Sequence, residues 1–209
     1  METNVLYKLS NGVYIIGAFM DGRAVGCTID TCFQITSENP LLNISLNKKN
    51  YTLEAIKANK RFSLSIVSLD TDPEIIGRFG FVSSRDTDKY NGRGYDVIAG
   101  APCVKGTFAG RLILEAERFI DCETHMLVIA RLVDTEAGEG EPMTYAYYRN
   151  SVKAKATTTV EKETATPQKK MRRYECELCG YIAEFEGEIP EDYICPLCGA
   201  DSSQFHEIN

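Results

Sequence analysis

Several features are absent from this sequence, and each absence removes a class of protein. No run of apolar residues reaches the roughly 20 that a membrane-spanning helix needs, so we expect no membrane partner. The first residues, METNVLYKLSNGVYIIGAFMDG, lack a basic region and a small-residue cleavage site, so no signal peptide is predicted and a cytoplasmic location is expected. The glycines near Asn91–Gly94 do not form a G-x-G-x-x-G motif after a strand, which excludes a Rossmann-type nucleotide site.

Basic residues are scarce at the C-terminal end. From Met171 onward there are two basic and nine acidic residues, so this segment carries the whole net charge of −7. An acidic segment argues against a nucleic-acid partner. It favours either docking to a protein with a basic patch or solubility alone.

Cysteine is present in a pattern that indicates a metal site. Four cysteines form two C-x-x-C pairs near the C-terminus: Cys176, Cys179, Cys195 and Cys198. Each pair can present two thiolates to one ion, and a closed tetrahedral set of four sulfurs binds zinc or iron. Gly180 and Gly199 follow the pairs, where a positive φ lets backbone N–H groups turn toward the sulfurs. The spacing alone is typical of zinc.

The other four cysteines lie scattered through strand-like sequence: Cys27, Cys32, Cys103 and Cys122. We expect them to be reduced and mostly buried, because the predicted compartment is reducing.

The length and pattern of the first part predict one sizeable, mostly β barrel. Residues 13–20 and 24–36, separated by Asp21-Gly22, are typical of a hairpin. Further strands are predicted at 41–47, 62–67, 112–119 and 126–133, with short helices at 52–60 and 73–81. The charged, glycine-bearing stretch 81–97 is expected to be a surface loop.

Two features in this barrel suit a ligand. In the strand at 41–47, Asn43, Ser45 and Asn47 share one face, which we expect to be open. The next helix follows Asn47-Lys48-Lys49-Asn50, and its unpaired N–H groups with a lysine form a possible anion seat.

The domain organisation follows from composition. Residues 1–150 form the barrel. Residues 151–170 are rich in Thr, Ala, Lys and Glu, poor in large apolar residues, and predicted to be a flexible linker. Residues 171–209 form the small metal module.

The C-terminal string MRRYECELCGYIAEFEGEIPEDYICPLCGADSSQFHEI resembles the short rubredoxin module found in rubrerythrins and multidomain rubredoxins. Besides the four thiolates, the matching residues are Gly180, Tyr181, Gly187, Pro190, Pro196, Gly199 and Phe205. The resemblance implies one iron ion, Fe(Cys)4, with zinc as the alternative.

Residues 7–150 resemble the flavin reductase-like FMN-binding family, through GCTIDTCFQITSENPLLNISLNKKNYTLEAIKANKRFSLSIVS and the later FGFVSSRDTDKY, DCETHMLVIARLVD and PMTYAYYRN. The resemblance implies a split β-barrel, a homodimer, FMN near the dimer interface, and hydride from NADH or NADPH. By position, it places Thr28, Thr31 and Gln34 at the isoalloxazine ring. The ribityl chain and phosphate would be held by Ser45, Asn47, Lys48, Asn50 and Thr52.

His125 matches a histidine that lies near the nicotinamide side of the flavin in some relatives, which makes it a candidate catalytic residue. The alternative is a structural hydrogen bonder beside a strand.

The combination resembles the high-molecular-weight rubredoxins of anaerobes, which implies an oxidoreductase passing electrons from NAD(P)H through FMN and iron to an acceptor protein. The implied acceptor is a flavodiiron protein that reduces oxygen or nitric oxide, and no protein nucleophile is required. One alternative is an NAD(P)H-dependent free-flavin or ferric reductase with an accessory metal module. Another is a non-enzymatic FMN-binding protein with a structural zinc ribbon.

Overall fold

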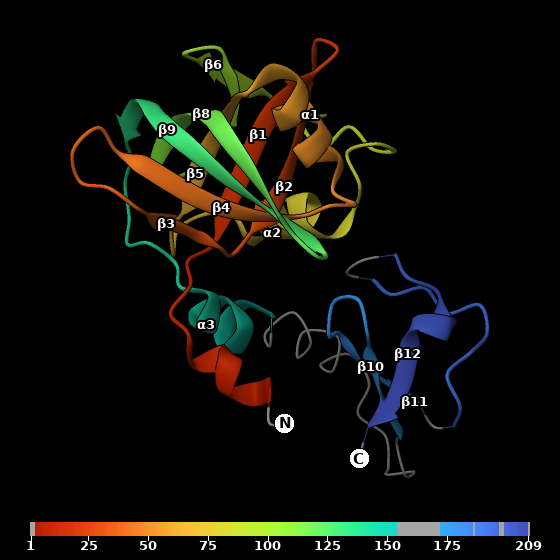
Figure 1. Cartoon of the computed structure of the whole chain (residues 1–209). Helices are drawn as coiled ribbons and strands as arrows, with labels where there is room; N and C mark the ends of the chain where they lie inside the picture. Colours follow the sequence, from red (N-terminus) through yellow and green to blue (C-terminus); the bar gives the residue numbers. More distant parts are fainter. Residues whose placement is uncertain (1–2, 154–171, 186, 197–198, 209) are drawn as a thin grey trace. The chain divides into compact units, whose positions relative to one another are not determined.

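The computed structural model describes residues 3–153, 172–185, 187–196 and 199–208 (Figure 1). The chain divides into two compact units, Met1–Tyr148 and Arg149–Asn209. Of the predicted linker 151–170, only residues 151–153 are described. They belong to a π-helical segment, η2 (Tyr148–Lys153), and the rest of the linker lies outside the described residues.

One antiparallel sheet of seven strands forms the first unit, in the order β2-β1-β5-β8-β9-β4-β3. The bounds are β1 (Tyr14–Met20), β2 (Arg23–Ile29), β3 (Cys32–Gln34), β4 (Leu41–Asn47), β5 (Arg61–Val67), β8 (Phe108–Cys122) and β9 (His125–Ala137). The two edge strands, β2 and β3, are separated in the chain by only Asp30 and Thr31. Because two residues cannot span a flat sheet, the sheet must curl until its edges meet, and the predicted mainly β barrel is confirmed.

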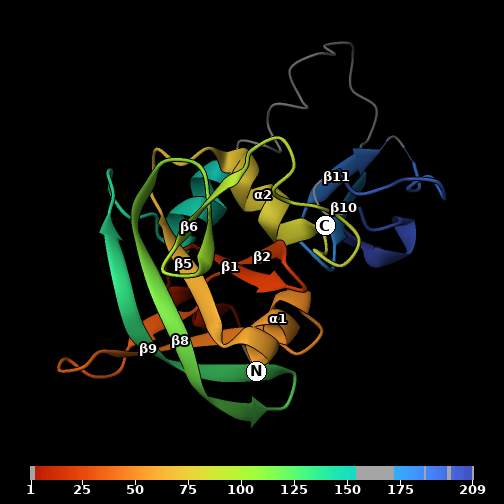
Figure 2. The same ribbon diagram turned by 90° about the horizontal axis from the view of Figure 1, so that it is seen from above.

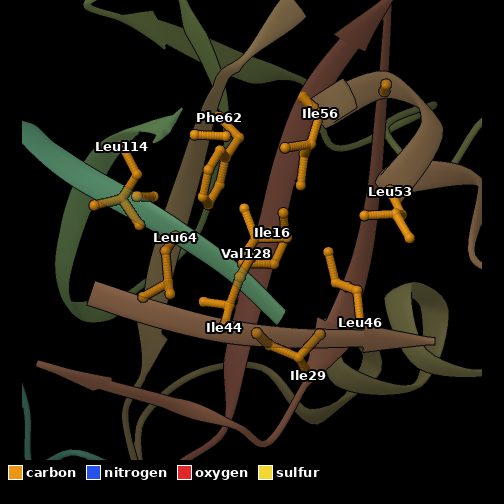
Figure 3. Packing of buried hydrophobic residues seen from close by; sticks show 14 of the residues in the cluster. Ile16, Ile29, Ile44, Leu46, Leu53, Ile56, Phe62, Leu64, Leu114 and Val128 are labelled. Atoms are coloured by element: carbon orange, nitrogen blue, oxygen red, sulfur yellow. The ribbon is translucent and has the colours of Figure 1, made fainter. Parts of the chain in front are cut away.

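The barrel interior is a single apolar core (Figure 3). Alternate positions of the strands point inward, as in β4, where Ile44 and Leu46 are buried. Helix α1 (Tyr51–Asn59) adds Leu53 and Ile56, both buried, to the same core. Figure 3 shows Leu53 and Ile56 pointing into the cluster that also contains Phe62 of β5, so α1 belongs to the barrel core.

The polar face predicted for β4 is less open than expected. Asn43 is 2% exposed and Ser45 is half-buried, whereas Asn47 at the end of the strand is exposed. β4 lies between β9 and β3 in the sheet. The alternating pattern showed which residues share a face, but it could not show which other segments cover that face. Only the Asn47 end of that face is open.

Both predicted helices are present. The N-terminus of α1 is set by Asn50, whose Oδ1 accepts a hydrogen bond from the Thr52 amide at 3.0 Å. The second helix, α2 (Pro73–Phe81), begins with a proline and is capped by Asp72. In Figures 1 and 2, α1 and α2 lie on the side of β1 and β2, while the long strands β8 and β9 form the opposite wall.

The stretch 81–97 departs from its prediction as a plain surface loop. Ser84, Lys89 and Tyr90 are buried, and Tyr95–Ile98 is a strand, β6, paired with β7 (Ala101–Val104). The connecting residues are Ala99 and Gly100, both with positive φ, as a tight two-residue hairpin requires. Because this stretch is polar in composition, its sequence did not reveal the hairpin or the three buried side chains.

Short helical segments flank the barrel strands: η1 (Thr3–Lys8), α3 (Tyr145–Tyr147) and η2. A bridge between Gly12 and Thr144 brings the two ends of the barrel chain together. Among the described residues, no helix is long and apolar enough to cross a membrane.

The second unit contains a three-stranded antiparallel sheet, β11-β10-β12, and a short 3-10 helix, η3 (Ser202–Gln204). The strands are β10 (Arg172–Cys176), β11 (Ile182–Phe185) and β12 (Phe205–Ile208). Its core is a chain of edge-to-face aromatic contacts that joins Tyr174, Phe185, Tyr193 and Phe205. Such a small core leaves a large share of the stability to the cysteine site.

Candidate flavin pocket and metal centre

A pocket of about 270 Å³ opens where four segments of the barrel meet. β2 supplies two residues, the end of β4 with the segment after it supplies three, α1 supplies its first residue, and the end of α2 with the following loop supplies the rest. The lining residues are Cys27, Thr28, Asn47, Lys49, Asn50, Tyr51, Phe79, Gly80, Val82, Ser83, Ser84 and Lys89. None of these described lining residues carries a carboxylate, and two carry amines. The pocket therefore suits an anion.

The entrance to α1 forms one wall. Asn47 and Asn50 both use their side chains to hold the backbone: Asn47 Oδ1 accepts from the Lys49 amide at 2.9 Å, and Asn50 Oδ1 caps the helix. These two bonds fix the turn that presents Lys49 and the helix N-terminus to the pocket. Positive partial charge at a helix N-terminus adds to that of the lysine.

The opposite wall is tied to β2 at one glycine. The Ser84 hydroxyl accepts from the Gly26 amide at 3.0 Å and donates to the Gly26 carbonyl at 2.9 Å. The Lys89 ammonium donates to the same carbonyl at 2.9 Å and to that of Phe79 at 2.8 Å. A Cβ at Gly26 would lie 2.5 Å from the Ile16 oxygen and 2.8 Å from the Phe79 ring, so glycine is required for this approach.

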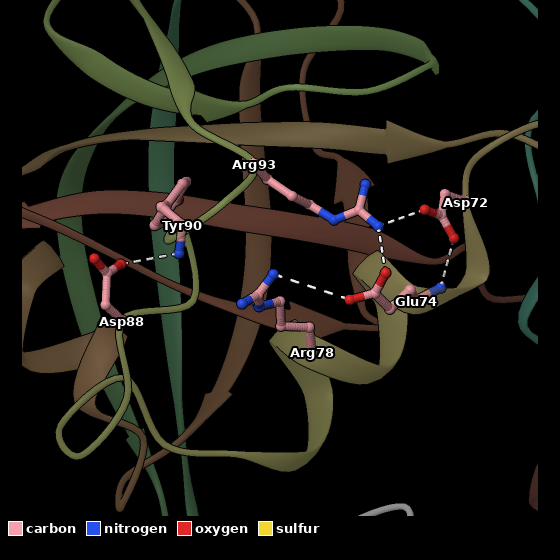
Figure 4. A network of polar contacts seen from close by, with 6 residues as sticks. All are labelled: Asp72, Glu74, Arg78, Asp88, Tyr90 and Arg93. Carbon is pink, nitrogen blue, oxygen red and sulfur yellow. Dashed lines mark hydrogen bonds and ion pairs between the residues drawn. The ribbon is translucent and has the colours of Figure 1, made fainter.

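A charged network secures the far end of the same loop (Figure 4). The Arg93 guanidinium contacts the Asp72 carboxylate and lies 2.8 Å from that of Glu74, at the start of α2. The hydrogen bond from Arg93 is the largest cause that lowers the pKa of Asp72. Loop residues 83–93 are thus pinned at both ends, and the pocket wall is a defined surface.

Burial shapes the charges at the pocket floor. Lys89 is 3% exposed, and burial lowers the pKa of its amine to about 8. Burial also raises the pKa of the Cys27 thiol, against smaller lowering effects of Lys89, Thr52 and Asn50. At neutral pH the floor therefore holds a neutral thiol beside an ammonium.

Three of the eight flavin-site residues predicted from sequence line this pocket: Thr28, Asn47 and Asn50. Thr28 is held by a bond from its hydroxyl to the Ile76 carbonyl at 2.9 Å.

The other five lie elsewhere. Thr52 is fully buried behind the α1 cap, and Lys48 forms an ion pair with Asp121 at 2.5 Å. Thr31 and Ser45 are half-buried neighbours, and the exposed Gln34 donates to the Thr36 carbonyl. None of the five lines the pocket, and their role toward a flavin stays a prediction.

His125 begins β9 and stands opposite Asn47 in the β4–β9 register. Its Nδ1 lies 2.9 Å from the Thr124 hydroxyl, and the residue is half-buried. It is next to a pocket residue but does not line the pocket, so its catalytic role also stays a prediction.

Lys49 lies in the predicted anion seat but was not assigned to the flavin, and sequence reasoning missed Ser83, Ser84 and Lys89 altogether. The only sequence signal was that 83–90 fell inside a family-like segment. Its polar composition does not distinguish a buried anchor from a solvated loop.

The metal centre in the second unit is built from two tight turns. The sulfurs of Cys176, Cys179 and Cys195 lie within 4.8 Å of one another, and those of Cys179 and Cys195 are 3.5 Å apart. All three residues are buried. The fourth predicted ligand, Cys198, lies outside the described residues.

The positive φ predicted for the two glycines is confirmed, whereas the predicted N–H contacts to the sulfurs stay a prediction. Gly180 and Gly199 have φ values of 65° and 72°, and their amides donate to the carbonyls of Cys176 and Cys195 at 2.7 and 2.9 Å. A converging, buried set of sulfurs fits iron or zinc and no harder ion.

The barrel cysteines agree with their prediction as thiols. Cys27, Cys32, Cys103 and Cys122 are free, with Cys27 and Cys103 buried and Cys122 exposed.

Comparison with known proteins matches both units. The flavin reductase like domain model matches residues 6–156, and the rubrerythrin, rubredoxin-like domain model matches residues 174–206. A high molecular weight rubredoxin of Moorella thermoacetica is 33% identical over the full length of both chains.

Two further relatives match mainly the barrel. A ferric-chelate reductase (NAD(P)H) of Archaeoglobus fulgidus is 36% identical over 76% of this chain and 95% of its own. The crystal structure of a flavin reductase domain protein from Arthrobacter sp. FB24 shares the fold, with a TM-score of 0.61 and 21% identity over 68% of this chain and 87% of that one.

These matches support flavin and iron as cofactors and an oxidoreductase acting in electron transfer. With a cation-lined pocket in the barrel and converging cysteines in the second unit, the chain belongs to the flavin reductase-like family and carries a rubredoxin-like domain at its C-terminal end.

Proposed function

We propose that this protein passes electrons from NAD(P)H, by way of FMN in the barrel and one iron ion in the rubredoxin-like module, to an acceptor protein such as a flavodiiron oxygen or nitric oxide reductase. The observation that carries the proposal is that one chain contains both a cation-lined pocket and a buried set of converging cysteine sulfurs. When bound, FMN exchanges a hydride for single electrons, and an Fe(Cys)4 centre carries one electron at a time.

The pocket residues fit a flavin phosphate ester. Lys49 and the capped N-terminus of α1 offer positive charge and amide donors for the phosphate, while Asn47 and Asn50 hold that turn in place. Thr28 lines the pocket from β2. Phe79 and Val82 provide apolar surface for a ring system, and the lining excludes carboxylates that would repel an anion.

The cysteine residues fit an iron ion held in a low-dielectric site. We propose that Cys198 completes the set begun by Cys176, Cys179 and Cys195. The turns closed by Gly180 and Gly199 hold the cysteine pairs rigid, so that the metal changes charge without rearranging its ligands.

The surface of the module supports docking to a protein partner. Leu178 and Ile194 are 67% and 55% exposed, and each is next to a cysteine of the metal centre. Both arginines of the module form ion pairs with its own glutamates, Arg172 with Glu207 and Arg173 with Glu184. The acidic excess is thus left to attract a basic partner around an apolar contact.

A homodimer is part of the proposal. The short edge strand β3 and the segment after it expose Phe33 (57%) and Ile35 (44%), and β9 exposes Val133 (43%). Exposed apolar side chains on an edge strand are typical of an interface. Light scattering on the purified protein gives the oligomeric state directly.

The test combines visible spectroscopy with one substitution. Anaerobic NADH added to the iron-loaded protein should bleach the flavin and Fe(III)–thiolate bands together. In Cys195→Ser, flavin reduction should persist while reduction of an added flavodiiron-type acceptor collapses. Cys122→Ser, which removes an exposed free cysteine, is the matched control and should behave as the wild type. Full acceptor reduction by Cys195→Ser would exclude the iron from the path.

A second candidate is a ferric or free-flavin reductase, favoured by the 36% identity to the ferric-chelate reductase over the barrel. In that case Cys195→Ser keeps full activity with a ferric chelate, and FMN leaves the protein on gel filtration. Zinc in place of iron in natively expressed protein would instead support the non-enzymatic alternative.

A further inference from the structure

An arginine–tyrosine–arginine cluster stands at the edge of the barrel pocket and has no part in the function proposed above. Tyr51, the first residue of α1, lines the pocket. The Arg85 guanidinium carbon lies 4.6 Å from the centre of its ring, and that of Arg23 lies 5.9 Å from it. Three elements thus bring two guanidinium groups to one aromatic ring.

Each arginine is held in place by a second contact. Arg23 donates from Nη2 to the Ser84 carbonyl at 2.6 Å, and Arg85 donates from Nη2 to the Glu54 carboxylate at 2.7 Å. A guanidinium has five N–H donors, and these bonds use one nitrogen of each. Arg85 is also accessible, with 56% of its side chain exposed. The cluster is therefore positioned yet able to bind.

The two guanidinium groups stand beside the pocket, outside the set of residues that lines it. Arg23 and Arg85 bring two positive charges close to the two lining lysines, Lys49 and Lys89. Among the described residues, Glu54 is the one carboxylate that forms an ion pair within this cluster. A flavin phosphate carries at most two negative charges. Because Lys49 and the N-terminus of α1 suffice for that phosphate, Arg23 and Arg85 are left for a second phosphate group.

We propose that Arg23, Tyr51 and Arg85 bind the diphosphate of a dinucleotide at the mouth of the pocket. Guanidinium groups match phosphate oxygens in a bidentate manner, and two of them on one ring fit two adjacent phosphates. The same chemistry is present in a nicotinamide dinucleotide and in FAD. The inference rests on the proposed function for the identity of the neighbouring ligand, FMN.

The primary experiment measures ADP binding by calorimetry to the FMN-loaded protein and, separately, to the flavin-free protein. Arg85→Gln should weaken ADP binding about tenfold, because it removes a charge-assisted bidentate contact. Glu54→Gln should strengthen it about twofold to fivefold, because the competing carboxylate is gone. A purely structural role for the Arg85–Glu54 pair would weaken binding in both variants. Arg118→Gln, an exposed arginine of β8 outside the pocket lining, is the control.

Two arms distinguish the source of the diphosphate. If it belongs to NAD(P)H, Arg85→Gln raises the KM for NADH and leaves kcat and the FAD-to-FMN affinity ratio unchanged. If it belongs to FAD, that ratio falls about tenfold while the KM stays constant.

Two outcomes would overturn the inference. One is that ADP does not bind, or binds equally well to wild type and Arg85→Gln. The other is that Arg85→Gln weakens FMN and ADP by the same factor, which would assign the arginine to the flavin's own phosphate. If FMN itself fails to bind, the proposed function fails. ADP binding to the flavin-free protein still tests whether Arg23, Tyr51 and Arg85 bind a diphosphate.

Discussion

The two units of the chain reach a functional site by opposite routes. The cysteine site of the second unit lies within a short stretch of chain: Cys176 and Cys179 are three residues apart, and Cys195, 16 residues after Cys179, lies within 4.8 Å of both. The barrel pocket takes its twelve lining residues from segments spread between Cys27 and Lys89. A local site can be recognised from spacing, whereas a dispersed site depends on every strand that brings its walls together.

The comparison extends to stability. The barrel has a core of many large buried side chains from six strands and α1, whereas the module has four aromatic rings and a metal centre. The module should therefore depend on its ligand and the barrel should not.

The largest predicted effect is that of metal removal. Chelation under reducing conditions should abolish the folding transition of the module, because structural metal binding contributes about 10–16 kcal/mol in small zinc domains. The barrel transition should keep its midpoint. Differential scanning calorimetry of the full chain with and without chelator checks this, and a parallel loss of both transitions would contradict the comparison.

Gly26→Ala should have the next largest effect, this time on the barrel. The new Cβ would meet the Ile16 oxygen and the Phe79 ring, and overpacking of this kind costs about 1–3 kcal/mol. Because Gly26 also anchors Ser84 and Lys89, flavin affinity should fall as well. Urea unfolding and flavin titration measure the two effects. Gly22→Ala is a poor control because of its positive φ, whereas Gly187→Ala in the module has open space and should leave the barrel unchanged.

The smallest predicted effect concerns the charge of Lys89. Its pKa of about 8 lies below the unfolded value of 10.5, so the unfolded chain binds more protons between these pH values. The titration of Lys89 therefore increases the free energy of unfolding as the pH rises from about 8 toward 10.5. Its positive charge is lost over the same range, so affinity for anionic FMN should decline above pH 8.

Lys89→Met should weaken FMN binding about tenfold at pH 7, the size of one lost charged hydrogen bond, and should flatten the pH profile. Lys57→Met, an exposed lysine of α1, is the matched control. An unchanged profile in Lys89→Met would assign the pH dependence to another group. The Cys27 thiol is a poor candidate, since burial raises its pKa.

Local pattern was sufficient for much of the fold. The predicted strand 41–47 matches β4, and the predicted helices 52–60 and 73–81 match α1 and α2 to within one residue. Local pattern did not show that the predicted strand 24–36 divides into β2 and β3. It failed at 81–97, where Ser84 and Lys89 are buried because carbonyls of Gly26 and Phe79 accept their hydrogen bonds. Gly26 is 58 residues from Ser84, so no local signal records that partner.

The sequence by itself determined the turns that carry the cysteines and the turn before α1, because each of them depends on neighbours only a few residues away: a glycine with positive φ or an asparagine cap. The tertiary structure alone decided which of the predicted flavin residues border the pocket, that Lys89 is a buried cation, and that Arg23 and Arg85 meet at Tyr51. The physical reason is that burial and charge depend on segments brought together by the curled sheet, and a single strand's pattern specifies which way a side chain faces but not what it will face.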